Sequence, residues 1–159
     1  MGALRYDFAG ESVLVTGASR GIGFAVARAF AMAGADVTVL SSGVGIHAAA
    51  EAISAAAGRE ARALECDITD SAAVKAALAG LDRIDVLVNN AGLERITPID
   101  GPDEVEDIFR RITDINTNGT FYATRHAVPK MAVGGRIIVT ASIWSRVAVP
   151  EFSAYITSK

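Results

Sequence analysis

Short apolar runs alternate with longer, alanine-rich stretches along the whole sequence. Five of these runs have the composition of strands, at 12–16, 36–40, 61–66, 84–88 and 136–140. Apolar residues at helical spacing follow them and predict helices at about 22–33, 45–57, 71–78, 103–131 and from 153 onward, the fourth as one helix or two consecutive ones. Strands that alternate with helices predict βαβ units. We therefore expect an α/β fold with a doubly wound parallel sheet and helices on both faces.

Several strand runs contain stretches that are apolar throughout, such as VLV at 13–15 and 86–88 and IIV at 137–139. This pattern is typical of strands that are covered on both faces of a parallel sheet. The 159 residues contain no linker, no low-complexity tract and no repeat beyond the alternation itself, and this length suits one domain. We therefore expect a single domain over residues 1–159.

The composition excludes several classes of protein. The formal net charge is −3 and the charged residues are interleaved, so no basic stripe indicates nucleic acid or a membrane surface as a partner. The N-terminus, MGALRYDFAG, lacks the apolar core of a signal peptide, and no run of ~18 apolar residues could span a bilayer. The single Cys66 cannot form an internal disulfide, and we expect a cytoplasmic protein. His47 and His126 have no second ligand near them in sequence, so no metal site is expected.

The segment TGASRGIG, residues 16–23, lies between the first predicted strand and the first predicted helix. In that context each glycine has a physical use. Gly17 permits a tight turn, Gly21 lets backbone N–H groups approach a pyrophosphate at the positive end of the helix, and Gly23 lets the helix pack close to the sheet. A glycine-rich turn without a ligand is the plain alternative, and the context favours nucleotide binding.

The spacing Gly-x-x-x-Gly-x-Gly resembles the fingerprint of the short-chain dehydrogenase/reductase family. Further patterns of that family follow in the same order: Asp67-Ile68 after the third strand, Asn89-Asn90-Ala91-Gly92 after the fourth, Asn116 with Gly119, Ser142 at the end of the fifth strand, and Tyr155-x-x-x-Lys159. Each pattern alone is weak, because a tyrosine and a lysine four residues apart are common on helices. Together they are specific for this family over residues 10–159. The residues of the motifs are most similar to those of 3-oxoacyl-carrier-protein reductase-like ketoreductases.

The resemblance implies a Rossmann-like fold and an oxidoreductase that transfers a hydride between a nicotinamide cofactor and a carbonyl or secondary alcohol carbon. Tyr155 would donate or accept the proton. A free tyrosine has a pKa of about 10, so Lys159, one helical turn away, would be needed to favour the phenolate. Ser142 would hold the substrate oxygen, and Asn116 would hold a water in the proton relay. The expected catalytic residues are therefore Asn116, Ser142, Tyr155 and Lys159.

The cofactor site implied by the resemblance comprises Gly17, Ser19, Arg20, Gly21, Ile22, Gly23, Ser41, Ser42, Asp67, Ile68, Asn89, Ala91, Gly92, Tyr155 and Lys159. NAD-preferring members usually have an aspartate after the second strand, where this chain reads LSSG at 40–43. Arg20 resembles the basic residue of NADP-preferring members, although an exposed, solubilising arginine is the plain interpretation. We expect NADP, with NAD as the alternative.

The substrate is expected to be a small carbonyl or alcohol compound. Residues beside the motifs would line its pocket, and ordinary packing or surface roles are equally open for them: Leu93, Glu94, Ile143, Trp144, Glu151 and Phe152. Two other functions compete with this prediction. A non-catalytic nucleotide-binding fragment or pseudoenzyme would bind the cofactor without turnover. A sugar-nucleotide epimerase shares Tyr-x-x-x-Lys but usually has the glycine spacing Gly-x-x-Gly-x-x-Gly, which this chain lacks.

Members of the family often form homodimers or homotetramers through the long helix and the helix with the tyrosine and lysine, and 103–131 is long enough for such an interface. Members also usually continue past the lysine with further strands and a substrate-covering lid, so the resemblance implies that the C-terminal third is absent. A helix ended at Lys159 would leave the fifth strand without its outer neighbour and an apolar face uncovered. We therefore expect the functional polypeptide to be longer.

Overall fold

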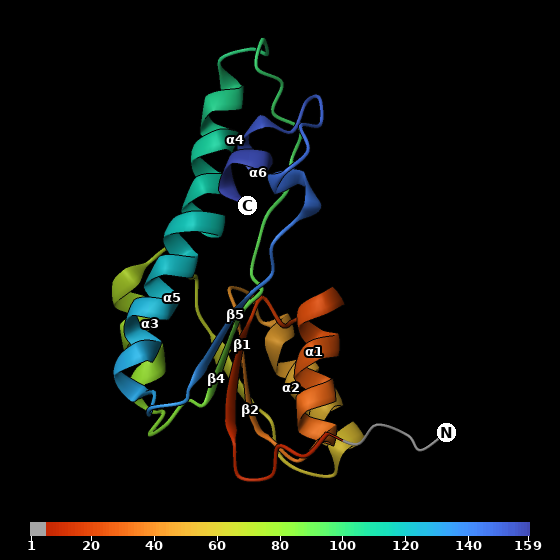
Figure 1. Ribbon diagram of the computed structural model, residues 1–159, viewed down its shortest axis with the longest axis vertical. Helices are drawn as coiled ribbons and strands as arrows, with labels where there is room; N and C mark the ends of the chain where they lie inside the picture. The colour runs from red at the N-terminus through yellow and green to blue at the C-terminus, as the bar shows by residue number, and fades with distance from the viewer. Residues whose placement is uncertain (1–5) are drawn as a thin grey trace.

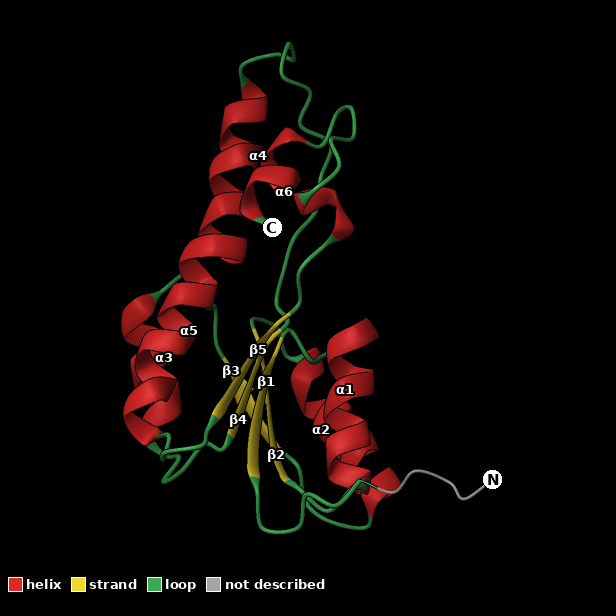
Figure 2. Cartoon of the chain, in the orientation of Figure 1, coloured by secondary structure: helices red, strands yellow, loops and turns green. Residues whose placement is uncertain are grey.

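A five-stranded parallel sheet forms the centre of the molecule (Figures 1 and 2). The computed structural model describes residues 6–159. The strands lie in the spatial order β3-β2-β1-β4-β5, and their bounds are Ser12–Thr16 (β1), Asp36–Ser41 (β2), Arg62–Glu65 (β3), Val86–Asn89 (β4) and Arg136–Val139 (β5). The order reverses between β1 and β4, because the chain builds outward from β1 to β3 and then crosses back. Ligands of such sheets bind at this reversal, beyond the carboxyl ends of the strands.

Helices cover both faces of the sheet (Figure 1). On one face α1 (Gly21–Met32) packs with α2 (Gly45–Ala57), and on the other α3 (Ser71–Ala79) packs with α5 (Thr120–Ala127). The helix α4 (Glu104–Thr113) extends past the carboxyl ends of the strands, and the short α6 (Ser153–Ser158) packs against it. The predicted doubly wound α/β fold is confirmed.

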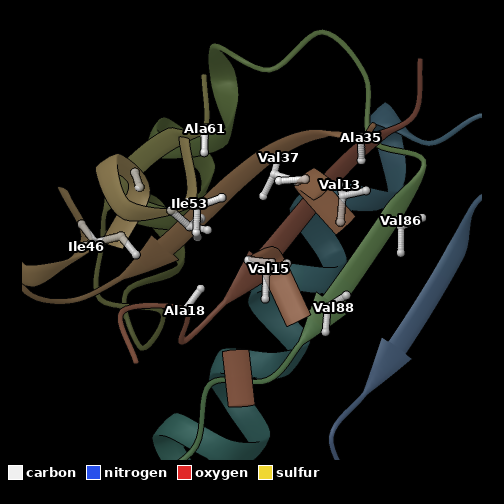
Figure 3. Close-up of a cluster of buried hydrophobic side chains, with 14 residues drawn as sticks. Val13, Val15, Ala18, Ala35, Val37, Ile46, Ile53, Ala61, Val86 and Val88 are labelled. Carbon is white, nitrogen blue, oxygen red and sulfur yellow. The ribbon is translucent and has the colours of Figure 1, made fainter. Parts of the chain in front are cut away.

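Alternate residues of the central strands point to opposite faces and build two apolar clusters. Val13 and Val15 of β1 join Ile46 and Ile53 of α2 in the cluster of Figure 3, whereas Leu14 belongs to the cluster on the side of α3 and α5. Each of these side chains is at most 1% exposed. Full burial of such a side chain contributes ~1.5–3 kcal/mol, so a strand between two helical layers must be apolar at every position.

Local sequence sets several helix ends. Asp70 caps α3 by accepting hydrogen bonds from the N–H groups of Ala72 at 2.9 Å and Ala73 at 3.0 Å. Gly34 follows α1 with a φ of 96°, and Gly58 ends α2 with a φ of 66°. These angles lie in the left-handed region that favours glycine. A glycine at each position is therefore a good sequence indicator of the helix end.

The helix predicted at 103–131 is one helical run that changes its winding. The helix α4 leads into a π-helical turn, η1 (Asp114–Gly119), then into α5 and a short 3-10 turn, η2 (Val128–Lys130). Asn116 and Gly119 are the buried residues of η1. A Cβ on Gly119 would lie 2.6 Å from the Ile68 side chain, so the run passes very close to the segment after β3. Single π-helical turns within α-helices frequently mark functional sites.

The fifth strand departs from one expectation. Ile137, Ile138 and Val139 are 44%, 47% and 54% exposed, because β5 is the edge of the sheet and its ladder partner is β4. The predicted cover on both faces is therefore wrong for the IIV run, whereas it is confirmed for VLV in β4, where every residue is buried. The uncovered apolar face expected at the fifth strand is present.

Candidate functional site

The β1–α1 turn and the segment after β4 lock together where the sheet order reverses. Thr16 Oγ1 accepts hydrogen bonds from the N–H groups of Asn90 and Ala91, each at 3.1 Å. The Asn90 side-chain amide donates to the carbonyl oxygens of Thr16 and Gly17, both at 3.2 Å. Gly17 has a φ of 64°, and a Cβ there would lie 2.6 Å from Ala91 Cα. Both the conformation and the close approach therefore require glycine at this position.

The N-terminus of α1 presents free backbone donors beside this junction. Its N-cap residue, Arg20, forms no side-chain cap, and its first turn has no acidic residue. Apart from its neighbours in the chain and the backbone of its own helix, no described atom lies within 4 Å of a Cβ placed on Gly21, whereas a Cβ on Gly23 would lie 2.5 Å from the Gly17 carbonyl oxygen. The first N–H groups and the positive end of the helix dipole thus face open space, which suits an anionic ligand.

A cleft of about 440 Å³ lies at this end of the sheet. Most of the predicted cofactor residues line it: Gly17, Ser19, Arg20, Gly21, Ile22, Ser41, Ser42, Asp67, Ile68, Ala91 and Gly92. Leu93, expected at the substrate, lines it too, as do five residues to which the motifs assign no role: Leu40, Cys66, Asn90, Arg111 and Ile115. A cleft of about 530 Å³ lies at the opposite end, around Asp36, Arg62 and Arg83. Parallel α/β sheets bind ligands at the carboxyl ends of their strands, so we assign the candidate site to the first cleft.

Asp67 lies in the cleft just after β3 and is held by several donors. Its Oδ1 accepts from the Thr69 N–H at 2.9 Å and the Thr69 hydroxyl at 2.8 Å, and its Oδ2 pairs with Arg111 at 3.3 Å. Partial burial tends to raise the pKa of Asp67, but these donors outweigh it and hold the pKa below its ordinary value. Asp67 therefore stays ionised at neutral pH, and Arg111 of α4 bounds the cleft beside it.

The end of β2 carries hydroxyl groups. A carboxylate at this place would repel a phosphate. Ser41 donates a hydrogen bond to Ser19 Oγ at 3.4 Å, which ties β2 to the glycine-rich turn. Ser42 and Arg20 are exposed and line the same cleft. Among the ion pairs of residues 6–159, none involves Arg20. A guanidinium and several hydroxyl donors around one cleft can bind a phosphate group.

The helix α6 places Tyr155 and Lys159 next to the cleft. The Lys159 ammonium lies 5.7 Å from the centre of the Tyr155 ring and donates to the Thr140 carbonyl oxygen at 3.0 Å. A Cβ on Gly92, which lines the cleft, would lie 3.3 Å from Lys159 Nζ and 3.4 Å from Asn116 Oδ1. Burial lowers the pKa of Lys159, because it disfavours the charged amine. The amine and the Asn116 amide oxygen therefore both lie close to Gly92, at the edge of the cleft.

Asn116 lies in the π-helical turn and is 5% exposed. Its side chain holds the backbone of Leu93 from both sides: Oδ1 accepts from the N–H at 2.7 Å, and Nδ2 donates to the carbonyl oxygen at 3.0 Å. Nδ2 also donates to Ser158 Oγ at 2.8 Å. An amide oxygen can accept two hydrogen bonds, so Oδ1 keeps one position for a further donor such as a water. Asn116 thereby joins the long helix, the segment after β4 and α6.

Ser142 begins the 3-10 turn η3 (Ile143–Ser145), where its Oγ accepts from the Trp144 N–H at 3.2 Å. This bond uses an acceptor position, so the hydroxyl hydrogen is left for another acceptor. The Trp144 ring lies edge-on to Tyr155, with 5.7 Å between the ring centres, and 4.9 Å from the centre of the Phe152 ring. Trp144 thus connects Ser142 with Tyr155.

Four predicted cofactor residues do not line the cleft: Gly23, Asn89, Tyr155 and Lys159. Asn89 is 3% exposed and donates to Thr124 Oγ1 at 2.9 Å, which ties β4 to α5. Gly23 packs behind the glycine-rich turn, so both residues support the wall of the cleft. Tyr155 and Lys159 adjoin the cleft through Gly92, and a direct contact of any of the four with a cofactor stays a prediction.

Only some of the predicted substrate residues lie beside α6. Trp144 and Phe152 pack together beside Tyr155, and the others outside the cleft are exposed: Glu94, Ile143 and Glu151.

Within residues 6–159 no helix is long and apolar enough to cross a membrane. The same residues contain no group of three or more His, Cys, Asp or Glu that could hold a metal ion. The N-terminal segment MGALRYDFAG was predicted to lack a signal peptide. Its first five residues lie outside the described residues.

Known proteins are similar to this chain in sequence and in overall structure. Residues 11–159 match the family described as short chain dehydrogenase. The D-threitol dehydrogenase of Mycolicibacterium smegmatis is 37% identical to this chain, and the match covers 97% of this chain and 62% of that protein.

Two similar solved structures contain a bound cofactor. The structure of an NAD⁺-bound xylitol dehydrogenase has a TM-score of 0.86 and 34% identity, over 96% of this chain and 60% of that one. A blue fluorescent protein from a metagenomic library, in complex with NADPH, has a TM-score of 0.85 and 33% identity, over 96% of this chain and 64% of that one. This chain therefore spans about three fifths of the length of these relatives.

Proposed function

Because this chain belongs to the short-chain dehydrogenase/reductase family, we propose that its protein transfers a hydride between NADP(H) and a carbonyl or secondary alcohol, with Tyr155 as the proton donor or acceptor. One observation carries the proposal: Lys159 Nζ and Asn116 Oδ1 both lie close to Gly92, at the edge of the glycine-lined cleft. The Tyr155 ring adjoins that amine. A group that can transfer a proton thus lies beside a site suited to a dinucleotide.

The residues of the cleft fit a nicotinamide dinucleotide. The uncapped N-terminus of α1 and the open space at Gly21 would hold the pyrophosphate. Asp67 and Ile68 would bind the adenine end, while Gly92 and Lys159 would adjoin the nicotinamide end. When bound, the cofactor supplies the hydride chemistry.

The proton chemistry falls to side chains of this chain. In the direction of reduction Tyr155 would donate its hydroxyl proton to the substrate oxygen, and in oxidation it would take that proton back. Ser142 would donate a hydrogen bond to the same oxygen, because its Oγ already accepts from Trp144 and its hydrogen is free. After reduction, the charge of Lys159 would stabilise the phenolate, Lys159 would pass a proton to it, and a water on Asn116 Oδ1 would then return a proton to the lysine.

We propose NADP rather than NAD as the preferred cofactor. Arg20, Ser41 and Ser42 line the cleft, and the end of β2 contributes no carboxylate. The relatives are compatible with either cofactor, since one similar structure contains NAD⁺ and another NADPH. The ratio of kcat/KM for NADPH to that for NADH decides the question, and a ratio below one would reject the proposal.

The substrate we propose is a small polyol or the ketone formed from one. Threitol and xylitol are polyols, and the dehydrogenases named for them are 37% and 34% identical to this chain. The exposed carboxylates of Glu94 and Glu151 would accept hydrogen bonds from substrate hydroxyl groups. A 3-oxoacyl substrate is the alternative, and a higher kcat/KM for such a ketone than for any polyol would favour it.

Replacement of the phenol tests the proton transfer. In the full natural chain, Tyr155→Phe should bind NADPH normally and lose kcat by a factor of about 10²–10⁴, the usual contribution of a general acid or base. Tyr122→Phe is the matched control, because it removes a phenol from α5. An active Tyr155→Phe variant would refute the role of Tyr155. Cofactor binding without turnover in the unaltered protein would favour a non-catalytic nucleotide-binding protein.

We also propose a homodimer or homotetramer that forms through the helical run from α4 to α5. Phe121, at the start of α5, is 56% exposed and would be covered by such an interface. Light scattering of the full natural chain should give two or four times the mass of one chain, and a monomer would reject the assembly.

A further inference from the structure

The helix that carries Tyr155 begins without a cap of its own. Phe152 occupies the N-cap position of α6 with φ −120° and ψ 36°, and its side chain forms no cap. The first N–H groups of a helix have no partner within the helix, and a buried one must find its partner elsewhere. The Ala154 N–H is such a group, because Ala154 is 0% exposed.

Thr97 supplies this cap from a distant part of the chain. It lies in the segment after β4, 57 residues before Ala154, and is 0% exposed. Its Oγ1 accepts from the Ala154 N–H at 3.0 Å, and its carbonyl oxygen accepts from the Ser153 hydroxyl. Its own N–H donates to the Glu151 carbonyl oxygen at 2.6 Å. Every polar atom of Thr97 is therefore bonded to the residues at the start of α6.

The backbone of Glu151 indicates that these contacts hold the start of α6 under constraint. Its φ of 67° makes it the only residue other than glycine with a positive φ in residues 6–159. A residue with a Cβ is unfavourable in this region and stays there only where its surroundings fix it. The bond from the Thr97 N–H fixes the Glu151 carbonyl, and a parallel bridge joins Thr97 to Phe152.

From these contacts we propose that Thr97 is a positioning residue: its hydroxyl caps α6 and so holds the Tyr155 phenol in reach of the substrate oxygen. The inference rests on the proposed function of Tyr155. Tyr155 directly follows Ala154 in the first turn of α6, so movement of the uncapped turn would move the phenol with it. Thr97 does not line the cofactor cleft, to which the segment after β4 contributes only the residues from Asn90 to Leu93. Loss of the cap should therefore lower kcat and leave cofactor binding intact.

Two variants separate the hydroxyl of Thr97 from its shape. Thr97→Val keeps the shape and removes the acceptor, whereas Thr97→Ser keeps the acceptor and removes a methyl group. In the full natural chain, Thr97→Val should lower kcat about tenfold or more with the KM for NADPH changed less than about twofold, and Thr97→Ser should retain kcat within about threefold. Thr157→Val is the matched control, because it removes a hydroxyl from the exposed side of the same helix, and its kcat should equal that of the unaltered protein.

The outcomes divide clearly. Native kcat in Thr97→Val would overturn the proposal, and so would an equal loss of kcat and cofactor affinity, which indicates a loosened fold. Should Thr97→Val fail to fold, Thr97→Ser decides: retained kcat supports the proposal, and a loss of about tenfold overturns it. Tyr155→Phe, measured alongside, tests the underlying function. An active Tyr155→Phe removes that function, whereas an inactive one beside a fully active Thr97→Val removes only the role of Thr97.

Discussion

Three glycines with nearly the same backbone conformation allow strain, crowding and ligand contact to be separated by replacement with alanine. Gly17, Gly21 and Gly58 have φ angles of 64°, 60° and 66°. A Cβ on Gly17 would lie 2.6 Å from Ala91 Cα, whereas one on Gly21 or Gly58 would have no described atom within 4 Å apart from the neighbouring residues and the local helix backbone. Gly21 lines the cleft and Gly58 does not. Gly58→Ala therefore measures backbone strain alone.

The expected losses of stability follow from these surroundings. A residue with a Cβ is ~1–2 kcal/mol less stable in the left-handed region, and the lower entropy of the unfolded chain affects all three variants alike. Gly17→Ala must also move a backbone atom of the segment after β4, and overpacking of this kind costs ~1–3 kcal/mol. We therefore expect Gly17→Ala to lower the free energy of unfolding by about 2–5 kcal/mol, and Gly21→Ala and Gly58→Ala by about 1–2 kcal/mol.

Urea unfolding measures these free energies, and titration with NADPH measures the dissociation constant of each variant. Gly21→Ala should weaken NADPH binding about tenfold or more, because its new methyl group enters the cleft where the pyrophosphate is expected. Gly58→Ala should bind NADPH as the unaltered protein does. Equal stabilities of Gly17→Ala and Gly58→Ala would refute the close approach of the two segments. Unchanged NADPH binding in Gly21→Ala would refute the placement of the pyrophosphate at α1.

Three further predictions follow from the same region and from the helix ends. Arg20→Ala should lower kcat/KM about tenfold for NADPH and leave that for NADH within about twofold in initial-rate measurements, because only NADPH has the 2′-phosphate; equal losses would exclude a phosphate contact. The lowered pKa of Asp67 stabilises the folded state above the ordinary value of 3.8, and this contribution is lost as the pH falls through the folded pKa. Arg111→Met should therefore be less stable than the unaltered protein in urea at about pH 6 and nearly equal to it near pH 2, and a difference that persists in acid would contradict the ion pair. Asp70→Ala should lower the free energy of unfolding by ~1 kcal/mol through loss of the α3 cap, and an unchanged urea midpoint would exclude that cap.

Strands could be predicted from the sequence where burial on both faces leaves an apolar run, as in β4. Their ends could be predicted less well. The run predicted at 84–88 became Val86–Asn89, since the N–H groups of Ile84 and Asp85 bond to Lys130 and Ser12 before the regular ladder begins. The exposure of β5 could not be inferred from its own residues, because an apolar run has the same sequence at an edge and in the middle of a sheet.

The candidate site could be predicted only where its residues belong to contiguous motifs. Asn90 lies within the motif at 89–92, so its place against the glycine-rich turn could have been expected. Arg111 and Thr97 have no such signal. Arg111 reaches Asp67 across 44 residues and Thr97 reaches Ala154 across 57, while patterns in one sequence report on neighbours within a turn or a strand. Long-range bonds of this kind become visible only in the folded chain.

The segment at 90–97 joins the parts of the candidate site that the motifs treat separately. Asn90 holds the glycine-rich turn, Leu93 is held by the Asn116 side chain, and Thr97 caps α6. In each case a side chain bonds to a backbone group, so each bond fixes the course of the chain as well as a side-chain position. A displacement of this segment would therefore move a wall of the cofactor cleft, the proposed water site and the helix of the tyrosine together. Loss of one bond has a narrower effect: without the Thr97 cap, the bonds of Asn90 and Leu93 still hold the wall of the cleft, so the phenol can move while cofactor binding persists.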